Sequence, residues 1–370
     1  MNPPWVRAYL SASDMPGSAP DFAQPPFLGA PEARFAPAPA DGVMPEDFFT
    51  TSNLPTYVRF RGAWLMPIRP RMDGVIVHRE GALETVEPRR VRRGEPVAMG
   101  LAEDGTEGIV VHSEGFLGGT ASANEFRFMS ADVSRERPVN YEELAHRIEE
   151  ERIRGGFLVW VVGPALVHSR ARTDFEWFIA NGYVQAVLIG NAVAVHDIEA
   201  AIYGTTLGVT STGRAVESGH GLHMRAINKI RAAGSIEAAV ASGLVTNGIM
   251  HALVTGKVPY VMAGSIRDDG PLPGVIVDTT EAQDAMRVHT VQATGAVFIA
   301  TALHAIAVGN MLPSFHSHRG SPEPLITICV DQTEFVVTKL KDRGTHQAYG
   351  VVTNAQDFMH VFRHYVERCR

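Results

Sequence analysis

The sequence predicts an α/β protein: a Rossmann-like parallel sheet with helices on both faces, preceded by a smaller β-rich N-terminal domain. Two observations predict this fold. After Gly156, short apolar runs alternate regularly with helical patterns, and continuous apolar strands joined by helices are typical of a parallel sheet that is covered on both faces. Before residue 130, the runs are short and are separated by turns rich in glycine and charged residues, which is typical of a β-rich region.

We therefore divide the chain into three segments. Residues 1–45 are rich in proline, alanine and glycine and lack periodicity, so we expect a flexible arm. Residues 46–138 form the predicted β-rich domain, and residues 139–370 form the predicted Rossmann-like domain. The strands expected in the β-rich domain are Tyr57–Phe60, Gly74–His78, Pro96–Leu101 and Gly108–His112.

The third segment begins with a predicted helix over residues 140–154, with Asn140 as its N-cap and Gly155-Gly156 as its end. Six apolar runs follow as predicted strands: Phe157–Val162, Tyr183–Ile189, Val258–Met262, Ala296–Ala300, Leu325–Val330 and Tyr349–Val352. The helical patterns between and after them are Asp174–Asn181, Asn191–Tyr203, His220–Ala233, Thr280–Val288, Thr301–Val308, Glu334–Arg343 and Gln356–Arg368. Glycines at 182, 204, 234 and 344 stand where helices are expected to end.

Composition excludes several classes of function. The formal charge is −7 and the basic runs are short, so we expect no nucleic-acid partner. Cys329 and Cys369 form no Cys-x-x-Cys pair, which argues against a zinc-thiolate site and fits a reducing compartment. The uncharged stretch Val291–Phe315 is long enough to cross a membrane, but its polar residues favour a buried strand and helix. We expect a cytoplasmic homo-oligomer without a membrane partner or a metal.

Ligands of open parallel sheets bind beyond the carboxyl ends of the strands. Small residues there let a ligand approach the backbone, and helix N-termini offer free N–H groups to a pyrophosphate. The cofactor-binding candidates at or after the strand ends are Gly163, Pro164, Gly190, Asn191, Ala192, Gly264, Ser265, Gly309, Asn310, Met311, Leu312, Asp331 and Thr353. Any one of these turns is also typical of an ordinary helix cap, and the chain has no G-x-G-x-x-G fingerprint. Several such turns on one edge favour a dinucleotide.

The loop from Ala263 to Pro273 (AGSIRDDGPLP) directly follows a predicted buried strand and carries Arg267, Asp268 and Asp269. These three charges indicate either a solvent-facing turn or a polar site, and the residues alone favour neither. In a site, carboxylates hold an ammonium or act as a base, and arginine binds a carboxylate through two hydrogen bonds.

Histidines and acids on two predicted helices are further candidates. His196 and Glu199 share one face of the helix that begins at Asn191, with Asp197 between them. A supporting hydrogen-bond network is as consistent with this pattern as direct catalysis. His220 and His223 have metal-ligand spacing but no third ligand, so we predict no metal there.

These same residues carry a resemblance to a known family. The stretches are 190–199 (GNAVAVHDIE), 225–228 (RAIN), 263–273 (AGSIRDDGPLP), 307–313 (AVGNMLP) and 338–340 (TKL). From about residue 46 onward, the chain resembles the lysine-oxoglutarate reductase/saccharopine dehydrogenase (LOR/SDH) conserved-region family. That family includes archaeal-type ornithine cyclodeaminase and the C-terminal half of cyanobacterial arginine dihydrolase/ornithine cyclodeaminase.

The resemblance implies a Rossmann-like domain that binds NAD and converts L-ornithine to L-proline and ammonia, within arginine and ornithine metabolism and proline biosynthesis. From loop position, we assign amine binding or proton transfer to Asp268 or Asp269, with His196 and Asp197 as alternatives. Arg267 or Arg225 is the expected carboxylate ligand, and His223 is a further substrate-binding candidate. Two other hypotheses stay open: an NAD-dependent amino-acid dehydrogenase or opine-type reductase, and a non-catalytic module that binds NAD or an amino acid.

Overall fold

The structure, a computed structural model, describes residues 19–114, 116, 139–268, 270–318, 321–341 and 348–370. The chain divides into two compact units. The first contains residues 1–131, 309–325 and 343–347, and the second contains residues 132–308, 326–342 and 348–370. We expect a domain boundary after residue 138. The residues that precede it, 117–138, lie outside the described residues.

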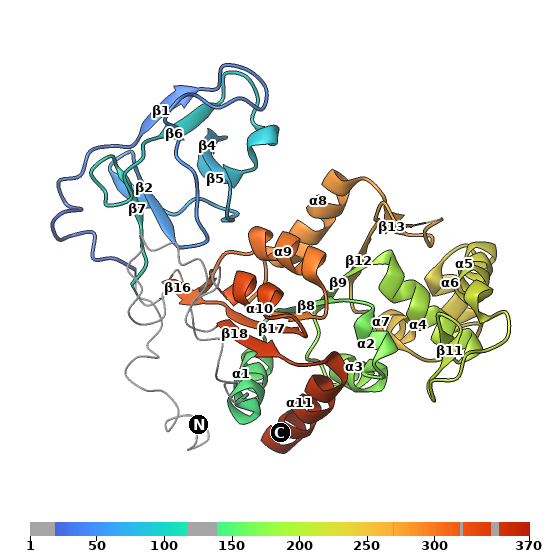
Figure 1. The fold of residues 1–370 in the computed structure, drawn as a ribbon. Helices are drawn as coiled ribbons and strands as arrows, with labels where there is room; N and C mark the ends of the chain where they lie inside the picture. Colours follow the sequence, from blue (N-terminus) through green and yellow to red (C-terminus); the bar gives the residue numbers. More distant parts are fainter. Residues whose placement is uncertain (1–18, 115, 117–138, 269, 319–320, 342–347) are drawn as a thin grey trace. The chain divides into compact units, whose positions relative to one another are not determined.

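Antiparallel strands build the first unit (Figure 1). One sheet has the order β1 (Arg34–Pro37), β6 (Pro96–Met99), β4 (Val75–Arg79), β5 (Ala82–Val86), and a second has the order β3 (Ala63–Leu65), β2 (Thr56–Phe60), β7 (Ile109–Val111). The 3-10 helix η3 (Pro88–Arg90) connects β5 to β6. Both faces of β4 are buried, because Ile76 belongs to one apolar cluster while Val75 and Val77 belong to another. The β-rich character predicted for this region is therefore confirmed.

Strand β1 lies inside the segment for which the sequence indicates a flexible arm. Its register with β6 runs from the pair Arg34–Met99 to the pair Pro37–Pro96. The composition conceals this strand because proline is tolerated on edge strands, and β1 is an edge. Residues 309–325 add a hairpin of β15 (Phe315–His318) and β16 (Ser321–Pro324) to the same unit. The predicted arm residues 1–18 lie outside the described residues.

The second unit contains a seven-stranded parallel sheet. Its order is β13 (Val275–Ile276), β12 (Tyr260–Ala263), β9 (Ala186–Gly190), β8 (Leu158–Val162), β14 (Gly295–Ile299), β17 (Ile326–Asp331), β18 (Ala348–Val352). Every neighbouring pair is parallel. All residues of the central strands β8, β9 and β14 are buried, which explains why their sequences are apolar at every position. The six predicted strands are confirmed, and β13 is an additional short one.

The strand order reverses once. From β8 the chain moves outward through β9 to β12, and it then returns to β14 and continues through β17 to β18 on the other side. The carboxyl ends of β8 and β14 therefore lie side by side while their connections lead in opposite directions. In doubly wound sheets, such a reversal point is where a ligand binds.

Helices cover both faces of this sheet (Figure 1). One face carries α1 (Tyr141–Arg154), α2 (Ala165–His168), α3 (Arg172–Ala180), α4 (Asn191–Tyr203), α5 (Leu222–Ala233), α6 (Ile236–Ala241), α7 (Ile249–Thr255) and α11 (Ala355–Cys369), which share one apolar core. The other face carries α8 (Thr279–Thr290), α9 (Ala302–Met311) and α10 (Glu334–Lys341). Short elements β10 (Thr205–Thr206), β11 (Val209–Thr210) and η4 (Gly219–Gly221) connect α4 to α5. Helices α6 and α7 were not predicted.

Local signals in the sequence explain where several of these helices begin and end. The Asn140 side chain accepts a hydrogen bond from the Glu143 N–H at 3.1 Å, and Gly155 ends α1 with a left-handed φ of 73°. The uncharged stretch 291–315 contains β14 and α9, as predicted. Of the helices that the structure describes, none is long and apolar enough to span a membrane.

Candidate active site at the carboxyl edge of the sheet

The reversal point is built around Gly163, directly after β8. Its N–H donates to the Ile299 carbonyl at 2.8 Å, and a Cβ placed on it would lie 1.8 Å from the Ala300 carbonyl oxygen. Ala300 itself has a left-handed φ of 52°, which is costly for alanine. Glycine is therefore required where the ends of β8 and β14 meet. Pro164 follows as the N-cap of α2.

A second close approach occurs at the end of β9. A Cβ placed on Gly190 would lie 2.7 Å from Cε1 of His304, which is in the first turn of α9. Gly190 is also the N-cap of α4, whose first residues are Asn191 and Ala192. The first N–H groups of this 13-residue helix face the same edge of the sheet, where they suit a phosphate.

The loop after β12 folds back on itself. The Asp268 carboxylate accepts from the Ser265 N–H at 2.8 Å, and the Asp268 N–H donates to the Ser265 carbonyl at 3.0 Å. Asp268 is partly buried and Arg267 is exposed. Gly264 precedes this turn and its N–H donates to the Ile276 carbonyl at 2.8 Å. Asp269 lies outside the described residues.

The far end of this loop is tied to two helices. The Asn191 side-chain oxygen accepts from the Leu272 N–H at 3.1 Å, and Asn191 is buried. Arg231, on α5, donates to the Pro271 carbonyl at 2.9 Å. The structure thus places the loop of Asp268 against the ends of both β12 and β9. It also commits the side-chain oxygen of Asn191, a predicted cofactor contact, to the loop.

We expect the Asn191 tie to matter for activity more than for folding. Asn191→Leu removes the acceptor and leaves the buried Leu272 N–H unpaired, which costs about 1–3 kcal/mol; Asn191→Asp keeps an acceptor at the same place. The expected result is a loss of kcat in Asn191→Leu that Asn191→Asp largely restores, with both proteins folded by circular dichroism. Equal activity of the leucine variant and the unmodified protein would contradict the role of this tie.

Asp197 is an anchor between helices. Its side chain has no exposed area. One carboxylate oxygen accepts from Arg172 Nε at 2.5 Å and from the Ile249 N–H at 2.9 Å, and the other accepts from the Met250 N–H at 2.8 Å. The carboxylate therefore caps the start of α7 and pairs with α3, and both of its oxygens are occupied.

His196 and Glu199 also lie within the helical layer. The His196 ring is 4.5 Å from the ring of His168 on α2, and its Nδ1 is 3.6 Å from a Glu199 carboxylate oxygen. Glu199 accepts from the Thr205 hydroxyl and the Gly208 N–H, each at 2.9 Å. Burial disfavours the charged carboxylate, but these hydrogen bonds together hold the pKa of Glu199 below its ordinary value. In this arrangement, His196 and Glu199 belong to a buried network of the helices, which is one of the two interpretations of their spacing in the sequence.

The remaining predicted residues follow other strands or lie on α5 and in the first unit. Asp331 ends β17, where its carboxylate accepts from the Thr333 N–H at 2.8 Å and its carbonyl accepts from the Thr353 N–H at 3.0 Å. Arg225 is exposed on α5, and His223 lies in the first turn of that helix. Gly309, Asn310, Met311 and Leu312 belong to the segment 309–325 of the first unit.

Two residues near the loop 263–273 carry no prediction from the sequence, Arg231 and His304. Arg231 gives no signal, since a basic residue near the end of a helix is ordinary. His304 gives a weak one, because it is a histidine in an otherwise apolar helix that directly follows a buried strand. Burial lowers the pKa of His304, and the negative charge of Asp268 acts in the opposite direction.

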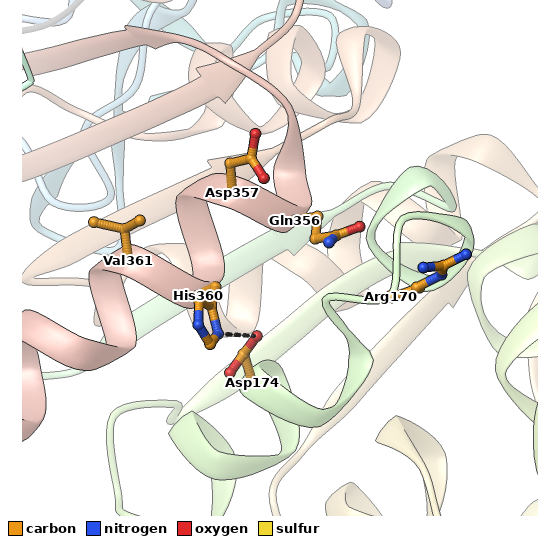
Figure 2. Close-up of a pocket in the computed structure, with 6 residues that line it drawn as sticks. All are labelled: Arg170, Asp174, Gln356, Asp357, His360 and Val361. Atoms are coloured by element: carbon orange, nitrogen blue, oxygen red, sulfur yellow. Dashed lines mark ion pairs between the residues drawn. The ribbon is translucent and has the colours of Figure 1, made fainter. Parts of the chain in front are cut away.

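A hollow on the second unit, of about 280 Å³, is lined by none of the predicted site residues. Figure 2 shows its lining side chains from α11, α3 and the turn after α2: Arg170, Asp174, Gln356, Asp357, His360 and Val361. Asp174 lies 3.7 Å from the His360 ring and 3.3 Å from Arg363, so its charge is already balanced. Among the described residues, no group of three or more His, Cys, Asp or Glu could hold a metal ion.

Three features define the class of the protein. They are the order of the strands, the reversal point where the backbones of Gly163 and Ala300 meet, and the start of α4, whose N–H groups have no side-chain cap. It is a Rossmann-type α/β protein, and its carboxyl edge fits a dinucleotide because the strand order reverses there and helix N–H groups face it.

Comparisons with known proteins identify the family. A family model described as "Arginine dihydrolase ArgZ-like, C-terminal, Rossmann fold" matches residues 142–362, and the corresponding "first region" matches residues 55–142. The ornithine cyclodeaminase of Methanopyrus kandleri is 45% identical over 334 residues, which cover 89% of this chain and 77% of that protein. The chain belongs to this ArgZ-like C-terminal family, together with the archaeal ornithine cyclodeaminases.

Solved structures agree. A LOR/SDH protein from Methanococcus maripaludis S2 has a TM-score of 0.80 and 39% identity, covering 92% of this chain and 99% of that one. The ternary complex of AgrE with ornithine and NAD+ has a TM-score of 0.57 and 33% identity, covering 92% of this chain and 47% of that one. The predicted fold class and the LOR/SDH resemblance are confirmed.

Proposed function

We propose that this protein is an NAD-dependent ornithine cyclodeaminase that converts L-ornithine to L-proline and ammonia. The observation that carries the proposal is the 45% identity to an ornithine cyclodeaminase over 89% of the chain. The related AgrE, which was crystallised with ornithine and NAD+, supports both the substrate and the cofactor.

Bound NAD would supply a hydride acceptor for ornithine and, once reduced, a hydride donor for the cyclic imine, so one turnover would leave the cofactor unchanged. We assign its binding to the carboxyl edge. The residues that we assign to NAD follow the ends of the strands. They are Gly163 and Pro164 after β8, Gly190 with Ala192 and the backbone of Asn191 at the end of β9, Gly264 and Ser265 after β12, Asp331 at the end of β17 and Thr353 after β18. The stretch 309–312 is a further candidate. Glycine at 163 lets the Ala300 backbone approach the end of β8, and glycine at 190 lets the His304 ring approach the end of β9.

Ornithine carries two ammonium groups and one carboxylate, so its site needs negative charge and a cation. We assign the ammonium contact to Asp268 or Asp269 and the carboxylate contact to Arg267, with Arg225 and His223 as alternatives on α5. Asp268 is held in place by its turn with Ser265, and a held carboxylate orients an amine more effectively than a mobile one. We leave Asp197 out of this set because both of its oxygens are occupied. His196 is left out because its Nδ1 is buried, 3.6 Å from the buried carboxylate of Glu199.

The test is an assay of the purified protein with L-ornithine and NAD. We expect proline and ammonia in equal amounts, with no increase in absorbance from NADH. An Asp268→Asn variant serves as the reference for lost activity. Steady formation of NADH would indicate an amino-acid dehydrogenase instead. Absence of any product, with NAD and ornithine still bound by calorimetry, would indicate a non-catalytic binding module.

The proposal extends to the setting of the enzyme. We propose that it works in the cytoplasm as a homo-oligomer and supplies proline from ornithine. Light scattering on the eluate of a sizing column tests the assembly. A single species with the 40.1 kDa mass of one chain would contradict it.

A further inference from the structure

His304 lies at the candidate site, and the sequence motifs assign it no role. The residue is in the first turn of α9, five positions after the last residue of β14. Its ring packs over the end of β9, where Cε1 is 2.7 Å and Nδ1 is 3.5 Å from the position of a Cβ on Gly190. Glycine at 190 therefore makes room for this ring.

The ring of His304 is available for chemistry. The residue is partly buried, yet neither ring nitrogen has a hydrogen-bond partner among the residues that the structure describes. Nδ1 of His196 and Nδ1 of His223 also lack a hydrogen bond, but they are sealed from solvent, whereas the His304 nitrogens are not. An imidazole without a partner at the mouth of a ligand site can accept a proton from what binds there.

The charge state of the ring suits a base. Burial lowers the pKa of His304 from its ordinary value of 6.5, so the ring is neutral at neutral pH. Of the described charged groups, Asp268 is the one that acts on the ring, and it favours the protonated form. A neutral imidazole beside a carboxylate can take a proton and is then stabilised as the imidazolium.

We propose that His304 is the general base that takes a proton from the α-ammonium of ornithine, with Asp268 stabilising the imidazolium that forms. This inference rests on the proposed function. The N–H bond of the ammonium breaks and an N–H bond forms on the imidazole. The amine lone pair then forms the C=N bond as the Cα–H electron pair leaves with its hydrogen to NAD, the oxidant. The neutral δ-amine then bonds to Cα and closes the ring. The imidazolium gives its proton to the former α-amino group as its bond to Cα breaks and ammonia leaves, and the hydride returns to the cyclic imine. His304 ends the cycle neutral.

His289 provides a matched control. It is also a histidine whose pKa is lowered by burial, but it lies on α8 and its ring stacks on Phe157 with the centroids 6.3 Å apart. Phe157 directly precedes β8, so this histidine is at the amino edge of the sheet.

The experiment compares His304→Gln with His289→Gln. We expect His304→Gln to lower kcat by about 10²–10⁴-fold while the Kd for NAD changes by less than about threefold, and His289→Gln to keep the kcat of the unmodified protein. In the unmodified protein, kcat/KM should fall as pH decreases below the pKa of His304. Equal kcat in both variants would overturn the proposal, and so would a tenfold weaker NAD affinity with unchanged kcat.

A second readout does not depend on activity. NMR titration of the histidine rings, with the His304 resonance assigned from His304→Gln, should give a pKa below 6.5 that falls further in Asp268→Asn. The same pKa in both proteins would overturn the pairing. If the unmodified protein makes no proline, the proposed function fails, and this titration still tests the pair. If it makes proline and His304→Gln does so equally well, the role of His304 alone fails.

Discussion

Replacing Asp197 with alanine is expected to lower the free energy of unfolding by about 3 kcal/mol, the lower end for a broken buried ion pair. The lower end applies because Arg172 keeps Glu176 and Asn247 as partners. Arg172 bonds to Asp197 at 2.5 Å, and the side chain of Arg172 is only 18% exposed. The same substitution removes the acceptor for the N–H groups of Ile249 and Met250 at the start of α7, and a lost helix cap costs about 1 kcal/mol. The broken ion pair and the lost cap come from the same carboxylate, so their two free-energy costs are not summed.

Chemical denaturation followed by circular dichroism measures this effect. Glu367→Ala is a suitable control, since it removes an exposed carboxylate that pairs with Arg363 one helical turn away on α11. Such surface pairs contribute about 0.3–0.5 kcal/mol. A loss below about 1 kcal/mol in Asp197→Ala, or equal losses in the two variants, would contradict the anchoring role. A folded and stable but inactive Asp197→Ala would return Asp197 to the catalytic candidates.

Gly163→Ala is expected to destabilise the protein by about 3 kcal/mol, the upper end for an added methyl group in a packed interior. The new Cβ would lie 1.8 Å from the Ala300 carbonyl oxygen, which is backbone and cannot rotate away as a flexible side chain would. The ends of β8 and β14 must then separate. Because they form the proposed cofactor site, NAD binding should weaken together with stability.

Gly221→Ala makes the matched comparison. A Cβ on Gly221 meets nothing within 4 Å, and its φ of −91° suits any residue. We expect its free energy of unfolding to change by less than about 0.5 kcal/mol. Thermal denaturation and NAD calorimetry on both variants check this. Equal melting temperatures of Gly163→Ala and Gly221→Ala, together with normal NAD binding by Gly163→Ala, would contradict the need for glycine where β8 and β14 meet.

Much of the fold could be predicted because the central strands are buried on both faces and are therefore apolar at every position. β8, β9 and β14 are covered on both faces, so every residue is apolar and the runs stand out. Strand β1 and helices α6 and α7 were missed for the opposite reason. The first is a proline-containing edge strand, and the other two are short helices whose packing, and not their periodicity, makes them helical.

By itself, the sequence determined the class of fold, the family, and the loop AGSIRDDGPLP as the place to look for chemistry, because these depend on local composition and contiguous motifs. Only the tertiary structure decided that Asp197 is an anchor while Asp268 lies in a loop held against the ends of β12 and β9. The partners of Asp197 come from residues 172, 249 and 250, far along the chain. The same holds for His304, which reaches Gly190 across 114 residues because the strand order reverses between β8 and β14. Burial and hydrogen bonding depend on which distant segments meet, and packing decides that.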